Sequence, residues 1–239
     1  MDIAGKRVLV TGGTEGIGLE MARQLKAKGA AVIVCGRRQT LLNSATAEGF
    51  QAIAADLTNA AACAELATTV ATDGLDILIN NAGAGSDYDV DGPANLADND
   101  RVIFLNLNAP VHLITHLLPV LRARPEAAIV NVTSGLAIAP RAGGPIYCAT
   151  KAALRSFTMA LRYQLRDSKV HVIEALPPVV ETQMTAGRAG SKMSAAECAS
   201  QIVRAIETNR REANVGMVKL LKAVYALSPA LARSIMIRF

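Results

Sequence analysis

The chain has 239 residues, of which 51% are hydrophobic and 19% charged. These figures suit one large folded domain and exclude a disordered chain. Aromatic residues make up only 3% and tryptophan is absent, which argues against a stacking platform for single-stranded nucleic acid. The net charge is +5, but four basic residues follow Glu212, the last acidic one, and the other 21 stand against 20 acidic residues, a net of +1. No basic stripe crosses the body, so no nucleic-acid partner is expected.

The cysteine and histidine residues show no pattern of a metal site. The four cysteines form no C-x-x-C pair, and His112 and His116 lack both a following glutamate and a third ligand. We therefore expect reduced structural thiols and no bound metal.

The chain also shows no sign of a targeting segment. The first apolar run, Val8 to Val10, begins too early to leave room for a signal peptide, and eighteen successive apolar residues occur nowhere. This predicts a cytoplasmic location.

Short β-branched runs alternate with longer helical patterns along the chain. We expect strands at Arg7–Thr11, Ala31–Cys35, Gln51–Ala55, Asp76–Ile79, Ala128–Val132 and Val170–Glu174. Near-continuous apolar strands separated by amphipathic helices are typical of a parallel sheet covered on both faces, because each right-handed crossover returns across a face. The sequence predicts a doubly wound α/β fold with three layers, α/β/α.

The first strand runs into a glycine-rich turn, Thr11-Gly12-Gly13-Thr14-Glu15-Gly16-Ile17-Gly18, and a helix follows. Gly12 permits the tight turn, Gly16 lets the backbone approach a pyrophosphate, and Gly18 allows helix and strand to pack closely. Free N–H groups at the helix start attract phosphate. A turn without a ligand is the alternative, but the flanking strand and helix favour a Rossmann-type dinucleotide site. We expect one such domain over residues 1–215, followed by a tail over 216–239.

The end of the second strand indicates which dinucleotide is bound. An NAD site usually has an acidic residue here, whereas this chain has Gly36-Arg37-Arg38 and no Asp or Glu between Ala31 and Ala47. Two guanidiniums suit a 2′-phosphate, so NADP(H) is favoured and NAD(H) remains possible. Glu15 would repel this phosphate unless its side chain points to solvent. Alternatively, Arg37 and Arg38 only lie at the solvated start of a helix and bind no phosphate.

A second group of polar residues predicts acid–base chemistry. Tyr147 and Lys151 lie four residues apart in a helical sequence that follows Pro145, so they share a helix face. Ser134 comes at the end of the fifth predicted strand, where parallel sheets bind their ligands. Three elements therefore converge on one site.

With Asn80-Asn81-Ala82-Gly83 after the fourth strand, Asp56 after the third, and Asn106, the chain resembles the short-chain dehydrogenase/reductases. The resemblance extends from Lys6 to about Gly216. The stretch Ala128–Ala153 and the segment that begins at Pro177 are further similar to the DltE-like oxidoreductases within this family. The resemblance implies an NADP(H)-dependent oxidoreductase that interconverts a ketone or aldehyde and an alcohol. A cofactor-binding sensor without turnover is the alternative.

The resemblance also implies roles for four catalytic residues. Tyr147 would exchange a proton with the substrate oxygen, and Ser134 would donate a hydrogen bond to that oxygen. Lys151 would stabilise the phenolate and bind the nicotinamide ribose, and Asn106 would hold a water linked to Lys151. Three alternatives remain open. Ser134 could simply cap the strand end, Asn106 could be a buried amide with all its hydrogen bonds satisfied, and Asn108 could hold the position assigned to Asn106.

By the same resemblance, Asn80 and Gly83 would line the adenosine side of the cofactor, Asp56 would accept the adenine amino group, and Thr182 would hold the carboxamide. Asp56 could equally be a helix N-cap. The full expected cofactor set is Gly12, Thr14, Gly16, Ile17, Gly18, Arg37, Arg38, Asp56, Leu57, Asn80, Ala82, Gly83, Tyr147, Lys151, Pro177, Val180 and Thr182.

The segment Gln183–Lys192 is too short to form a large lid, so small or open-bound substrates are expected. The predicted pocket residues are mostly uncharged and suit an apolar ketone or alcohol: Ala84, Gly85, Ile138, Gly143 and Met184. Arg141 and Arg188 could instead favour an anionic substrate.

The resemblance implies a homodimer or homotetramer in which the helices that carry Asn106 and Tyr147 meet across a two-fold axis. Core packing is an equal explanation for their apolar residues, Leu113, Leu117, Val120, Phe157, Leu161 and Leu165. The tail, Gly216–Phe239, combines four basic residues with an apolar pattern broken by Pro229. It predicts two short amphipathic helices that pack on the domain or a neighbouring subunit, or that contact a membrane peripherally.

Overall fold

The fold is described from a computed structural model, which covers residues 1–86, 88–93, 95–187 and 190–238. Within these residues seven parallel strands form one sheet, in the spatial order β3-β2-β1-β4-β5-β6-β7. The strands are β1 (Arg7–Thr11), β2 (Ala31–Gly36), β3 (Gln51–Ala54), β4 (Ile77–Asn80), β5 (Ala127–Val132), β6 (Val170–Leu176) and β7 (Glu212–Asn214). The predicted doubly wound fold is confirmed.

All six predicted strands are present, with ends that differ by two residues at most. The seventh, β7, was not predicted. It has three residues, Glu212, Ala213 and Asn214, of which only the alanine is buried, so its sequence contains no apolar run. It exists because it pairs with the end of β6 at the edge of the sheet.

The strand order reverses between β1 and β4. The chain forms β1, β2 and β3 in one direction and then returns to place β4 on the other side of β1. In open α/β sheets, ligands bind in the crevice beyond the carboxyl ends of the strands at this switch point. The topology therefore places a binding crevice above the ends of β1 and β4.

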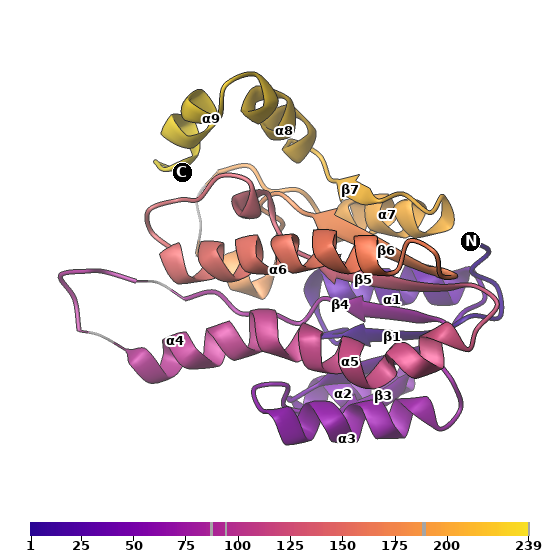
Figure 1. The fold of residues 1–239 in the computed structure, drawn as a ribbon. Helices are drawn as coiled ribbons and strands as arrows, with labels where there is room; N and C mark the ends of the chain where they lie inside the picture. Colours follow the sequence, from indigo (N-terminus) through magenta and orange to yellow (C-terminus); the bar gives the residue numbers. More distant parts are fainter. Residues whose placement is uncertain (87, 94, 188–189, 239) are drawn as a thin grey trace.

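Helices cover both faces of the sheet (Figure 1). The described helices are α1 (Gly16–Ala27), α2 (Gln39–Ala47), α3 (Ala60–Ala71), α4 (Leu96–Ile103), α5 (Ala109–Arg122), α6 (Pro145–Gln164), α7 (Ala195–Glu207), α8 (Val218–Leu227) and α9 (Pro229–Met236). Side chains alternate along each strand, so that Val8 and Val10 pack with α1 and α7, whereas Leu9 packs with α3 and α5. Two apolar cores result, one on each side of the sheet.

The helices α4 and α5 are joined by a π-helical turn, Phe104–Asn108, into one continuous helix over 96–122. By length and composition alone it could cross a membrane. Its inner side, however, packs in the core against α3 through Leu113, Leu117 and Leu121. It is therefore a core helix of this domain.

Most apolar residues considered for a two-fold contact are core residues instead. Leu113, Leu117, Leu161 and Leu165 are all buried within this chain, so core packing explains them. Val120 and Phe157 are partly buried against the same core.

A buried ion pair connects α6 to the sheet. The carboxylate of Glu174 on β6 is fully buried, and Arg155 Nη1 on α6 lies 2.6 Å from its Oε2. Thr133 Oγ1 donates to the other carboxylate oxygen at 2.8 Å. Since an unpaired buried carboxylate is strongly destabilising, Arg155 fixes α6 against the end of the sheet.

The tail folds back onto the domain as the two predicted helices, α8 and α9, which Figure 1 shows in yellow beyond the loops that follow β5 and β6. Val218 at the start of α8 is buried, and Lys222 forms an ion pair with Glu212. At the far end, the Ala142 N–H donates to the Ile237 carbonyl at 3.0 Å. The tail therefore continues the domain.

Candidate active site

The glycine-rich turn between β1 and α1 has the backbone geometry that its sequence predicts. Gly12 and Gly16 have positive φ angles of 60° and 55°. A Cβ at Gly18 would lie 2.3 Å from the Gly12 carbonyl oxygen, so only glycine permits this contact. The Asn81 side chain donates to the carbonyls of Thr11 and Gly12 at 2.9 and 3.2 Å. Asn81 is thus a positioning residue that the sequence analysis did not single out.

A crevice of 580 Å³ opens above this turn at the switch point of the sheet. Fifteen of the seventeen expected cofactor residues line it: Gly12, Thr14, Gly16, Ile17, Arg37, Arg38, Asp56, Leu57, Ala82, Gly83, Tyr147, Lys151, Pro177, Val180 and Thr182. The bare backbone at Gly12 and Gly16 provides a cradle that side chains would fill. The crevice therefore suits a dinucleotide with its pyrophosphate against the start of α1.

The two remaining residues of that set lie beneath the crevice. Gly18 packs on the turn itself, as described above. The Asn80 side chain is buried and donates to Asn131 Oδ1 at 2.9 Å, and Asn131 in turn donates to Thr158 on α6. The Asn80 side chain therefore links β4, β5 and α6, and the expected place of Asn80 along the adenosine side stays a prediction.

Both arginines at the end of β2 have an acidic partner. Arg38 forms an ion pair with Glu15, and Arg37 Nη1 lies 3.9 Å from Asp56 Oδ2. All four side chains are about half exposed, and exposed pairs of this kind contribute only about 0–1 kcal/mol. Glu15 is therefore held beside Arg38, and a 2′-phosphate would have to compete with two weak ion pairs.

Asp56 does not cap a helix, contrary to the alternative considered for it. The N-cap of α3 is Asn59, whose side chain accepts from the Ala62 N–H at 2.9 Å. Asp56 Oδ1 accepts from the Thr58 N–H at 3.2 Å, in the segment that precedes α3. Its carboxylate remains in the crevice wall beside Arg37.

Helix α6 carries Tyr147 and Lys151 one turn apart near its start. Pro145 is its first residue, where a proline costs no hydrogen bond. Lys151 is 4% exposed, and its Nζ donates to the Val132 carbonyl at 2.9 Å and lies 5.8 Å from the centre of the Tyr147 ring. Burial lowers the pKa of Lys151 to about 8. At neutral pH the lysine therefore remains largely protonated beside the phenol.

The burial of Lys151 predicts a pH-dependent stability. Below pH 8 both the folded and the unfolded chain hold this proton, so the cost of burying the charge is present in full. As the pH rises from about 8 towards 10.5, only the unfolded chain still binds the proton, and the folded state gains about 3 kcal/mol. Lys151→Met lacks this gain, so its free energy of unfolding relative to the wild type should fall by this amount over that range.

Denaturant unfolding at a series of pH values would measure this difference. Lys219→Met, which removes an exposed lysine from α8, controls for the loss of one positive charge. The prediction would be contradicted if the difference in the free energy of unfolding between Lys151→Met and the wild type stays constant from pH 7 to about pH 10.

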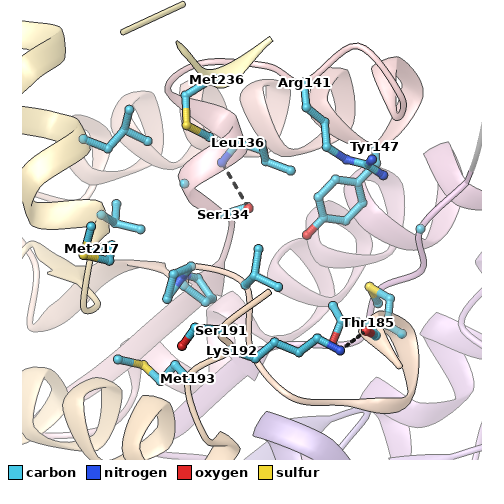
Figure 2. Close-up of a pocket in the computed structure, with 18 of the residues that line it drawn as sticks. Ser134, Leu136, Arg141, Tyr147, Thr185, Ser191, Lys192, Met193, Met217 and Met236 are labelled. Carbon is cyan, nitrogen blue, oxygen red and sulfur yellow. Dashed lines mark hydrogen bonds between the residues drawn. The ribbon is translucent and has the colours of Figure 1, made fainter. Parts of the chain in front are cut away.

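Ser134 lies directly beyond β5 and lines both cavities of the site. Its Oγ accepts from the Leu136 N–H at 3.1 Å and so begins a 3₁₀ turn, Gly135–Ala137. Figure 2 shows the Tyr147 hydroxyl pointing into the cavity on the side of Ser134. Ser134 therefore has both a capping role and a position beside the phenol.

Asn106 is the buried, satisfied amide that was one of its two interpretations. Its Nδ2 donates to the Ala84 carbonyl and to Thr150 Oγ1, and its Oδ1 accepts from the Ala84 N–H. A Cβ at Gly83 would lie 3.1 Å from Asn106 Oδ1 and 3.5 Å from Lys151 Nζ. Asn106 therefore fixes the loop after β4 against Lys151. This position agrees with the choice of Asn106 over Asn108, which rested on the register of the motif.

The segment after β6 closes over the phosphate turn. Pro177 accepts a hydrogen bond from the Gly135 N–H at 2.9 Å, and Val180 pairs with Met193. Thr182 begins a 3₁₀ turn, Gln183–Thr185. A Cβ added at Gly16 would lie 3.2 Å from Thr182 Cγ2. The Thr182 methyl group thus approaches the glycine turn closely.

A second cavity of 1230 Å³ adjoins the dinucleotide crevice. The two share Ser134 and Tyr147. Of the five pocket residues that were predicted, Gly85 and Met184 line this cavity, and Ala84 lines the dinucleotide crevice. Neither cavity has Ile138 or Gly143 in its wall.

Much of the second cavity's wall comes from the tail, through Met217, Val218, Leu220, Leu221, Val224, Ala232, Ile235 and Met236. Helices α8 and α9 therefore line the site together with the short segment Gln183–Lys192. The expectation of small or open-bound substrates, which considered that segment alone, stays a prediction. Arg141 does line the cavity, whereas Arg188 lies outside the described residues.

Comparisons with known proteins agree with this geometry. A family model described as short chain dehydrogenase matches residues 6–193. The chain is 45% identical over 188 residues to an uncharacterized oxidoreductase, DltE, of Bacillus subtilis, covering 76% of this chain and 74% of that protein. It is 31% identical over 241 residues to a fatty acyl-CoA reductase of Acinetobacter baylyi, covering 95% and 82%. A short chain dehydrogenase from Burkholderia cenocepacia, solved in complex with NADP, superposes with a TM-score of 0.88 over 99% of both chains at 25% identity.

Proposed function

The chain belongs to the short-chain dehydrogenase/reductase family, and from this premise we propose that it is an NADP(H)-dependent oxidoreductase interconverting a ketone or aldehyde and an alcohol. One observation carries the proposal. Tyr147 and Ser134 lie where the dinucleotide crevice meets the second cavity, so a carbonyl held in that cavity can reach both side chains and the nicotinamide end of the crevice. The relatives' names either give no substrate or differ in substrate, so they support the reaction type only.

A bound nicotinamide dinucleotide supplies or accepts the hydride at the carbon atom. Tyr147 donates its hydroxyl proton to the carbonyl oxygen during reduction and accepts it during oxidation. Ser134 Oγ–H donates a hydrogen bond to the same oxygen and orients it towards the phenol. At 5.8 Å from the ring centre, the Lys151 ammonium stabilises the phenolate by about 3 kcal/mol at an effective dielectric of 20.

The burial of Lys151 disfavours a silent sensor. Removing a lysine from water costs stability, as the lowered pKa of about 8 records. Ribose binding alone would give this lysine a use in a sensor, but only proton transfer through Tyr147 requires a cation close to the phenol. This supports an enzyme over the sensor alternative.

We also propose that NADP(H) is the preferred cofactor. Arg37 and Arg38 lie in the crevice wall and would hold a 2′-phosphate, whose binding would compete with weak exposed ion pairs to Asp56 and Glu15. The NADP complex of the Burkholderia relative supports this choice. A similar structure, from Burkholderia phymatum, was solved in complex with NAD. NAD(H) is therefore compared with NADP(H) in the experiment below.

A panel of ketones and aldehydes tests both proposals together. Purified protein should oxidise NADPH with at least one carbonyl, and kcat/KM for NADPH should exceed that for NADH by about tenfold or more. NADPH oxidation is followed at its absorbance band, with protein lacking the carbonyl as the blank. Failure of every carbonyl would reject the enzymatic proposal, and an equal or higher kcat/KM with NADH would reject the cofactor preference.

A further inference from the structure

We propose that the substrate carries a long unbranched aliphatic chain, which lies between the loops after β5 and β6 and the helices α8 and α9. The inference rests on the oxidoreductase function proposed above and specifies its substrate class. It begins from the size of the second cavity. At 1230 Å³ the cavity exceeds the range of about 300–1,000 Å³ that holds ordinary small ligands, so a small ketone would leave most of it filled with water.

The cavity has a polar end and an apolar arm. Tyr147, Ser134 and Arg141 line the reacting end, and the wall also contains Ser86, Thr185, Ser191, Lys192 and Glu197. The apolar arm is the part of the cavity under α8 and α9, where the wall residues from these two helices are all aliphatic or methionine. In Figure 2, Tyr147 and Thr185 lie on one side of the cavity, and Met217, Met236 and Met193 lie on the other. A carbonyl at Tyr147 therefore places the rest of the substrate along the apolar arm.

The roof of the arm is made by the inner faces of α8 and α9. Leu221 and Val224 contribute from α8, and Ala232, Ile235 and Met236 contribute from α9. These helices contain no acidic residue, and their lysines and arginines are not part of the cavity wall. A substrate with polar groups along its length would bury those groups without partners, which is costly.

Methionines favour a flexible chain over a rigid ring system. Four of them, Met184, Met193, Met217 and Met236, line the cavity. Their unbranched side chains adapt to ligands of varying shape. Each methylene that enters the arm is removed from water, so affinity should grow with chain length until the arm is full.

A series of straight-chain methyl ketones from butanone to decanone, assayed with NADPH, tests the inference. We expect kcat/KM to rise by about two- to fourfold for each added methylene. A flat series with turnover that still depends on Tyr147 would overturn the substrate class and leave the oxidoreductase function standing. A rigid polycyclic ketone turned over better than decanone would overturn it as well.

Two substitutions on α8 separate the arm from general effects on the helix. Val224→Trp fills the arm, and we expect it to lower kcat/KM for decanone by about tenfold or more with butanone changed by less than about twofold. Leu227→Trp adds the same side chain at a residue that is 89% exposed and does not line the cavity, and it should change neither. Leu221→Phe provides a second filling variant if Val224→Trp does not fold.

Decanol binding gives a readout that needs no turnover. In the presence of NADP⁺, decanol should raise the melting temperature of the wild type and of Leu227→Trp, but not that of Val224→Trp. If no carbonyl is reduced and decanol still binds in this pattern, the oxidoreductase proposal fails and the aliphatic site remains. Absence of decanol binding to the wild type would overturn the inference.

Discussion

Tyr147→Phe is expected to lower kcat by about 10²- to 10⁴-fold, because it removes the hydroxyl that we propose exchanges a proton with the substrate oxygen. Tyr147 lies in the wall shared by both cavities, and its hydroxyl points into the second one (Figure 2). The ring remains, so packing in the crevice is retained. NADP(H) affinity and melting temperature should stay close to those of the wild type.

Tyr163→Phe is the matched control for this substitution. Tyr163 lies on the same helix, α6, is 67% exposed and lines neither cavity. Steady-state kinetics with the best carbonyl of the panel would compare the two variants. If Tyr147→Phe retains wild-type kcat while both variants fold, the phenol does not transfer the proton and the proposed mechanism is wrong.

Arg155→Met is expected to lower the free energy of unfolding by about 3–5 kcal/mol, because it leaves the Glu174 carboxylate charged and buried without its cation. Glu174 is fully buried, and among the residues that the structure describes its carboxylate then keeps the hydrogen bond from Thr133. The other acidic partner of Arg155 is Glu212, at 3.7 Å. Denaturant unfolding measures the loss.

Two further variants test the cause of this loss. Arg23→Met removes a guanidinium from partly exposed ion pairs with Glu20 and Glu48 and should cost only about 1 kcal/mol. Adding Glu174→Gln to Arg155→Met removes the buried charge and should restore part of the stability. If Arg155→Met costs no more than Arg23→Met, the buried pair does not hold α6 in place.

The local features of the site could be predicted because each depends on neighbouring residues in the chain. The glycine turn follows from a strand, three glycines and a helix in succession, and the structure has Gly12 and Gly16 in the conformations that this requires. The shared face of Tyr147 and Lys151 follows from helical spacing. Ser134 could be placed because parallel strands present their carboxyl ends at one edge.

Other features depend on residues that meet only after folding. The pairing of Glu15 with Arg38 joins the first turn to the end of β2, whereas the sequence showed only that Glu15 could oppose a 2′-phosphate bound by the arginines. Asn80 and Asn81 are adjacent and chemically identical, yet one is buried against Asn131 and the other holds the glycine turn. Which asparagine does which depends on the twist of β4 and the loop after it.

The sequence by itself determined the doubly wound fold and the dinucleotide turn, since these follow from short-range periodicity and spacing. The proton-transfer roles of Tyr147, Ser134 and Lys151 came from the resemblance to the family and stay predictions. Only the tertiary structure decided the shape of the substrate site. The amphipathic pattern of the tail was visible, but its apolar face could equally have met a membrane, a second subunit or its own domain. Contacts of Val218 and Ile237 with loops far away in the chain place the tail on its own domain, where it lines the cavity beside Tyr147. Contact of its outer face with a membrane or a second subunit stays a prediction.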